Sequence, residues 1–226
     1  MPIHPAIDAA LVWAERADPN DPGLQLRDYR LRHEAVRRLF RQHVNPGAFH
    51  TVLAGAYAIC GLTGRQLREV NRCRFERARW WLSLLAENDD GAVVFAALQR
   101  LTPQVRHGAL TFINDSAVAT SKFLHFLNPA CAPIWDSRAA ACLDLRPMPD
   151  HTPEQQAAAY CEYWDLLISA SCAGASLPPR FQNTLNAPLD AHLDRDRQRA
   201  SRLCALEVLL FQYGSWIAAS NSLKPN

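Results

Sequence analysis

The chain has 226 residues, of which 49% are hydrophobic and 20% are charged, enough to build and solvate a sizeable core. No apolar run of about 18 residues and no secretory leader are visible, so we expect a cytoplasmic protein that does not span a membrane. The formal net charge is only +2, but residues 27–79 alone carry +8. This segment suggests a basic face that contacts phosphates, although solvated arginine-rich helices would explain the same charge.

Helical periodicity dominates the chain and no alternating strand pair is visible, which predicts an all-α, compact, multi-helix domain over residues 1–226. Asp136 and Thr152 have the positions of helix N-caps, and Pro153 and Gln155 complete a capping box with Thr152. Thr120 or Ser121 would cap a short helix that ends at Asn128. The helices expected besides this one cover residues 6–16, 27–43, 48–60, 64–86, 91–101, 103–113, 136–145, 152–171 and 199–219.

The common signatures of metal and phosphate sites are missing from the sequence. The seven cysteines are too widely spaced for a disulfide framework, a CxxC zinc pair or an iron–sulfur cluster. We interpret them as small buried residues of a reducing compartment, and we expect no metal and no cofactor. Gly-rich phosphate loops and the HExxH and GxSxG motifs are also absent.

One lysine stands out because the chain uses arginine for nearly all of its positive charge. There are 22 Arg and two Lys, and Lys224 lies in the C-terminal tail. Lys122 opens the segment Lys-Phe-Leu-His-Phe-Leu, a helix that is apolar nearly all round and therefore expected to be buried. Burial favours the neutral amine, which is a nucleophile, whereas a guanidinium is not. A lysine that extends its amine into water from the first helical turn is the structural alternative.

A carboxylate follows 14 residues later, at the start of the next expected helix. Pro129 and Pro133 keep the connection short and extended, so Asp136 is expected to come near Lys122. Asp136 would serve as an N-cap, and a capping carboxylate is held rigidly in its ionised form.

The order of a small-residue turn, Lys122, an apolar helix, a Pro-containing loop and Pro133-Ile-Trp-Asp136 resembles the active-site segment of helix-hairpin-helix DNA glycosylases. The resemblance is to bacterial 8-oxoguanine DNA glycosylase-like proteins, and it covers about residues 110–145. It implies that Lys122 attacks the sugar C1′ and forms a Schiff base, while Asp136 stabilises the developing positive charge. It also implies two helical lobes around a cleft, which would comprise residues 1–101 and 102–226. The family's hairpin has glycines, whereas this chain has Ala117-Val-Ala-Thr-Ser121, whose helix-terminal amides remain available to an anion.

Further residues are candidates for substrate contacts. Ser121, His125, Trp135 and Arg138 neighbour the two catalytic candidates; His125 would move a proton and Trp135 would stack on an extruded base. Core packing is the alternative for His125 and Trp135. The candidates for DNA backbone contacts are Arg72, Arg74, Arg77 and Arg79, which precede Trp80 and Trp81 in the sequence.

The sequence therefore predicts a DNA glycosylase with AP lyase activity in base excision repair, which removes a damaged base such as oxidised guanine. Its partner would be DNA, with RNA or a modified nucleotide as alternatives. Two other functions are compatible with the same residues: a non-catalytic nucleic-acid or nucleotide binding module, and an interaction protein of a bacterial stress or defence system.

Overall fold

The structure, a computed structural model, describes residues 4–18, 71–88, 90–145, 151–174, 178–181 and 202–222. Helices make up 76% of it, and the described residues contain no strand, which confirms the all-α prediction. The helices expected at 27–43 and 48–60 lie outside the described residues, as does most of the basic segment 27–79.

The described helices of the first half are α1 (Pro5–Arg16), α4 (Arg72–Glu87), α5 (Gly91–Gln99) and α6 (Pro103–Thr111). Side chains cap the first three, whereas α6 begins with Pro103 and has no side-chain cap hydrogen bond. His4 caps α1, the Asn71 side chain accepts from the Arg74 amide at the start of α4, and Asp90 accepts from two amides of α5. Each cap gives an otherwise unpaired first-turn N–H group an acceptor, which explains where these helices begin.

The second half contains α7 (Ala117–Leu127), α8 (Ser137–Ala141), α9 (Pro153–Cys172) and α11 (Arg202–Ser222). The predicted caps Asp136 and Thr152 are confirmed, the latter with its full capping box. The predicted cap of α7 is wrong: the cap is Ser116 and α7 begins at Ala117, directly after Asn114 and Asp115, which turn the chain with φ angles of 53° and 50°. Lys122 consequently lies in the second turn of α7 rather than the first.

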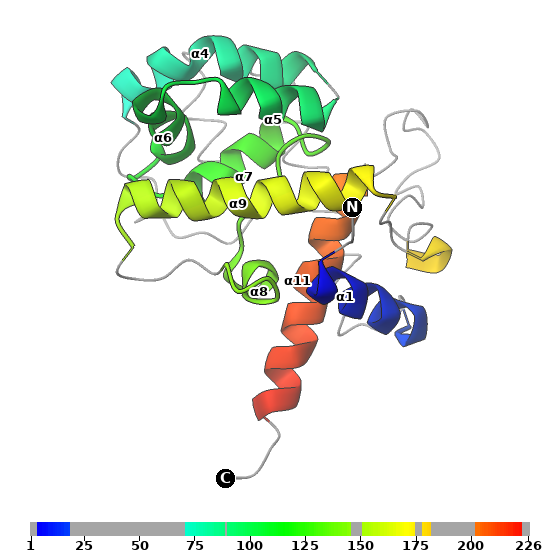
Figure 1. Cartoon of the computed structure of the whole chain (residues 1–226). Coiled ribbons are helices and arrows are strands. Elements are labelled where there is room, and N and C mark those ends of the chain that lie inside the picture. Colours follow the sequence, from blue (N-terminus) through cyan, green and yellow to red (C-terminus); the bar gives the residue numbers. More distant parts are fainter. Residues whose placement is uncertain are drawn as a thin grey trace, which may run out of the picture.

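Helix α9 crosses the middle of the molecule and joins two groups of helices (Figure 1). On one side α4 packs on α5 and α6, while on the other α11 packs on α1 and α8, and α7 lies along α9. Contacts between α4 and α6, and between α1 and α11, cross the boundary that the sequence placed at residue 101. The division into two lobes stays a prediction.

Aromatic side chains of α9 fill the centre of the core. Tyr160, Tyr163 and Trp164 are wholly buried. Trp164 meets Trp81 of α4 edge to face at 6.1 Å, and Tyr160 stacks on Trp135 at 6.0 Å. Such ring pairs add packing energy beyond the area that they bury, so α9 holds α4 and the segment before α8 in fixed positions.

Helix α11 has the length and apolar composition of a membrane-spanning segment over residues 202–220. More than half of this window is buried inside the protein, where it packs against α1, α8 and α9. A core helix that is apolar on most sides passes the same test of length and composition.

Candidate functional site

Lys122 occupies the least buried position in its part of α7. Its neighbours Ser121, Phe123 and Leu124 are buried, whereas the Lys122 side chain is half-buried. Lys122 is therefore flanked in the sequence by buried residues, as the sequence predicted.

A hydrogen bond joins the segment of Lys122 to the segment of Asp136. The backbone N–H of Trp135 donates to Ser121 Oγ at 3.0 Å, and the Ser121 hydroxyl in turn donates to the carbonyl of Val118 at 2.9 Å. Lys122 directly follows one partner of this bond and Asp136 directly follows the other. The two candidate catalytic residues are thus each one residue away from a shared, buried contact.

Three buried ring side chains fix the loop between α7 and α8, residues 128–136, by hydrogen bonds to its backbone carbonyl groups. Successive carbonyls at positions 131, 132 and 133 each accept one hydrogen bond: Cys131 from Trp164 Nε1 at 2.8 Å, Ala132 from His125 Nδ1 at 2.8 Å and Pro133 from Tyr160 Oη at 2.7 Å. Buried carbonyls without donors would be costly, so these bonds fix the path of the loop. Sequence reasoning missed this arrangement because the donors come from α7 and α9.

The first residue of the loop is tied to the end of α4. The Asn128 side-chain amide donates to the carbonyls of Leu85 at 2.9 Å and Asn88 at 2.8 Å. Both ends of the loop are therefore anchored, which makes it a rigid support for Asp136.

Asp136 is half-buried and caps α8, since its carboxylate accepts the N–H of Arg138 at 2.7 Å. This hydrogen bond fixes the orientation of the carboxylate at the start of α8. A catalytic role for Asp136 stays a prediction.

The predicted substrate contacts have different environments. Ser121, His125 and Trp135 are wholly buried, and their polar groups bond to the backbone of the same region. Arg138 alone of this set is exposed; its guanidinium lies 5.5 Å from the centre of the Phe211 ring, and its Nη1 lies 3.4 Å from Ser215 Oγ. Direct contact with a substrate stays a prediction for all four residues, and Arg138 has the position most accessible to one.

The four predicted phosphate-binding arginines of α4 do not share one environment. Arg72, Arg77 and Arg79 are exposed, and Arg79 pairs with Glu76 at 3.6 Å. Arg74 is half-buried and bonds to Asp115 and Thr111 in the turn before α7. Its charge is therefore engaged in holding α4 to that turn.

The backbone amides that the sequence offered to a phosphate already have partners within the protein. The Ala117 N–H donates to Gln156 Oε1 at 3.2 Å, and the Ala119 N–H donates to Ser116 Oγ at 3.3 Å. An anion at the start of α7 would have to displace these side chains.

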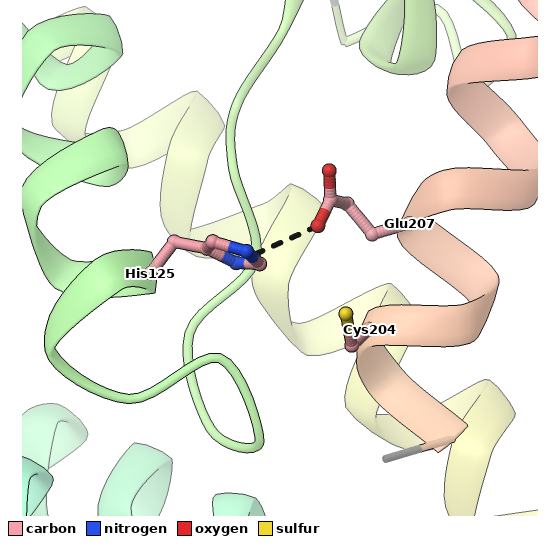
Figure 2. A group of neighbouring side chains, drawn as sticks. All are labelled: His125, Cys204 and Glu207. Atoms are coloured by element: carbon pink, nitrogen blue, oxygen red, sulfur yellow. Dashed lines mark ion pairs between the residues drawn. The ribbon is translucent and has the colours of Figure 1, made fainter. Parts of the chain in front are cut away.

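Sequence reasoning also missed a buried group that lies next to the loop (Figure 2). His125 of α7 faces Cys204 and Glu207 of α11, and the His125 Nδ1 atom lies 3.5 Å from Glu207 Oε2. The exposed fractions of the three residues are 0%, 4% and 3%. The only sequence signal is the three-residue spacing of Cys204 and Glu207, which places both on one helix face.

Burial governs the ionisation of the hydroxyl groups nearby. Desolvation raises the pKa of Tyr160 and Tyr163 well above the usual range, and the negative charge of Glu207 adds to both shifts. Both phenols are consequently neutral hydrogen-bond donors at physiological pH.

The arrangement places a half-buried lysine and an N-cap aspartate next to the two partners of one hydrogen bond. An amine can attack an electrophilic carbon, and a fixed carboxylate can stabilise the cation that forms there. The chain matches no protein-family model, no curated protein and no solved structure.

Proposed function

We propose that the protein is a DNA glycosylase with AP lyase activity that uses Lys122 as its nucleophile. The observation that carries this proposal is the hydrogen bond between Trp135 N and Ser121 Oγ, which joins the segments of Lys122 and Asp136. It is supported by the resemblance of residues 110–145 to the active-site segment of helix-hairpin-helix glycosylases. Residues 117–121, which that comparison placed in the hairpin turn, lie in the first turns of α7, and the turn that precedes them covers residues 112–116.

The reaction begins with a damaged nucleotide turned out of its stack. The amine of Lys122 attacks C1′, and the bond from C1′ to the base breaks; its electron pair leaves with the base, which takes up a proton. Asp136 stabilises the positive charge that develops on the sugar. Loss of the amine proton and opening of the sugar ring give a Schiff base. Removal of a 2′ proton then expels the 3′ phosphate by β-elimination.

Borohydride trapping on duplexes that each contain one damaged base tests this chemistry directly. We expect a covalent adduct with at least one duplex, and 8-oxoguanine opposite cytosine is the first to use. Lys122→Gln should abolish the adduct, while Lys224→Gln is the matched control and should leave it unchanged. Asp136→Asn should slow base removal more than it weakens DNA binding, because it removes charge stabilisation in the transition state. Full activity of Lys122→Gln would contradict the proposal.

A non-catalytic DNA-binding module is the second candidate. The hydrogen bonds of the Ala117 and Ala119 amides favour this candidate. In the glycosylase hairpin such amides bind a phosphate, whereas here they are already bonded to side chains of the protein. Binding would then depend on the exposed arginines of α4. Replacing Arg72 and Arg77 with Ser should lower the affinity for many sequences equally and reduce its salt dependence by about one counterion for each arginine that contacts a phosphate. Binding of this kind without any trapped adduct would support the module over the enzyme.

A further inference from the structure

The buried group formed by His125, Cys204 and Glu207 combines three chemically different metal ligands. Their donor atoms, an imidazole nitrogen, a thiol sulfur and a carboxylate oxygen, all lie within 4.8 Å of one another. Cys204 and Glu207 are three residues apart on α11, so one helix presents both toward α7 (Figure 2).

The donor set matches the preference of zinc. Zn²⁺ binds Cys sulfur, His nitrogen and Glu oxygen in tetrahedral sites, where neighbouring ligand atoms are about 3.3 to 3.7 Å apart. Small side-chain rotations would bring atoms that now lie within 4.8 Å to that separation. A thiolate in the set favours zinc over magnesium or calcium, which prefer oxygen ligands.

The histidine is oriented as a metal ligand would be. A carbonyl oxygen can only accept, so the 2.8 Å contact of His125 Nδ1 with Ala132 places the proton on Nδ1. In the neutral ring the lone pair is then on Nε2. Because Nδ1 is the nitrogen that lies 3.5 Å from Glu207 Oε2, the carboxylate would have to shift toward Nε2 to share an ion with it. Metal-binding histidines commonly donate their other ring N–H to a backbone carbonyl in this way, which fixes both the tautomer and the ring.

We propose that His125, Cys204 and Glu207 form an internal binding site for a divalent transition metal ion with the ligand preference of zinc. The ion would connect α7 to α11 directly behind the loop that carries Asp136. Its role is structural, because all three ligand residues are buried in the core. The proposal does not depend on the glycosylase chemistry.

Cobalt(II) binding to the chelator-treated full chain tests the site by its colour. A thiolate bound to Co²⁺ gives a charge-transfer absorption in the near ultraviolet, and tetrahedral Co²⁺ gives visible bands. We expect one equivalent of Co²⁺ to produce both and one equivalent of Zn²⁺ to displace them. Zn²⁺ should also raise the melting temperature of the protein.

Variants assign the ligands. Cys204→Ser should remove the charge-transfer band, whereas Cys161→Ser, a half-buried thiol on α9, should keep it. His125→Gln and Glu207→Gln should each weaken Co²⁺ binding by about tenfold or more. A wild-type protein that folds without Co²⁺ bands at equimolar metal would overturn the proposal, whatever the variants do. Bands that persist in a folded Cys204→Ser protein would overturn it too, since they would place the ion elsewhere.

Discussion

Ser121 and Trp135 are 14 residues apart in the sequence, and the Trp135 N–H donates to Ser121 Oγ at 3.0 Å within the core. The bond connects the second turn of α7 with the last residue before the cap of α8. Any displacement of one segment relative to the other must break it, so it sets the relative position of Lys122 and Asp136.

Removing this acceptor should destabilise the protein. Ser121→Ala leaves the buried N–H of Trp135 without an acceptor, and we expect a loss of about 1 to 3 kcal/mol in the free energy of unfolding. Urea denaturation measures the loss. Ser83→Ala, at an exposed position of α4, is the control and should change stability by less than about 0.5 kcal/mol. Equal effects of the two substitutions would refute the structural importance of the bond.

Two tyrosines of α9 provide a matched pair for the loop contacts. Both are wholly buried, but the Tyr160 hydroxyl donates to Pro133 at 2.7 Å, whereas the Tyr163 hydroxyl has no partner among the described residues. Tyr160→Phe should cost about 1 to 2 kcal/mol because a buried carbonyl loses its donor. Tyr163→Phe should be neutral or stabilising. Chemical denaturation of both variants decides the matter, and the reverse order of stabilities would contradict the structure.

Gly214 allows α11 to approach α8 closely. A Cβ atom at this position would overlap the backbone carbonyl of Arg138 and lie 3.1 Å from the sulfur of Cys142. Gly214→Ala should therefore separate the helices and destabilise the protein by about 1 to 3 kcal/mol, despite the better helix propensity of alanine. Gly91→Ala is the control, since its nearest contacts at 3.4 Å are ordinary. Thermal unfolding of both variants tests this, and a stabilised Gly214→Ala would show that the close approach is not required.

The thiols should differ in reactivity. Burial raises the pKa of both Cys142 and Cys161 from 9.0 to about 11, while Cys73 and Cys172 are exposed. A raised folded-state pKa means less reactive thiolate at pH 8, so iodoacetamide should label Cys73 and Cys172 first. Labelling of the other two should accelerate as the pH rises toward 11. Because the pKa of each of these two thiols is higher in the folded protein than in the unfolded chain, their contribution to the free energy of unfolding is complete below pH 9 and falls as the pH rises above 9.

Peptide mass spectrometry after timed labelling gives the order of reaction. In urea, where the folded environment is lost, the four cysteines should react at similar rates. Fast labelling of Cys142 in the folded protein at pH 8 would show that it is not buried as described.

Local signals in the sequence were sufficient to predict several helix boundaries. Two others were wrong: the helix expected from residue 64 begins at Arg72 after its cap Asn71, and α8 ends at Ala141 rather than near residue 145. The caps Asp136 and Thr152 and the stop at Asn128 depend on neighbouring residues only, and all three are confirmed. The start of α7 was placed late because two consecutive non-glycine residues, Asn114 and Asp115, adopt positive φ angles. Asparagine and aspartate tolerate this conformation, but their sequence does not specify it.

The site was predictable only in part, for a different reason. Lys122 and Asp136 are close in sequence, so the short loop between them was enough to predict that their segments meet, as the bond between Ser121 and Trp135 shows; their joint catalytic role stays a prediction. The contacts of His125 with Glu207, of Tyr160 with Pro133 and of Arg74 with Asp115 join separate helices. Such pairings depend on how the helices pack against one another. A single sequence does not specify that packing, so it does not reveal which polar residues come into contact.

The contact of Arg138 with Ser215 joins residues that are 77 positions apart in the sequence, so it can form only late in the synthesis of the chain. At about 5 to 20 residues per second, a ribosome needs roughly 4 to 15 seconds between these two positions. For most of that interval α7, the loop and α8 have been synthesised, but α11, which begins at Arg202, has not. The surface around His125 and Cys142 that α11 later covers is then open to solvent and to chaperones. A nascent chain stalled before residue 202 would present this apolar surface as its exposed face.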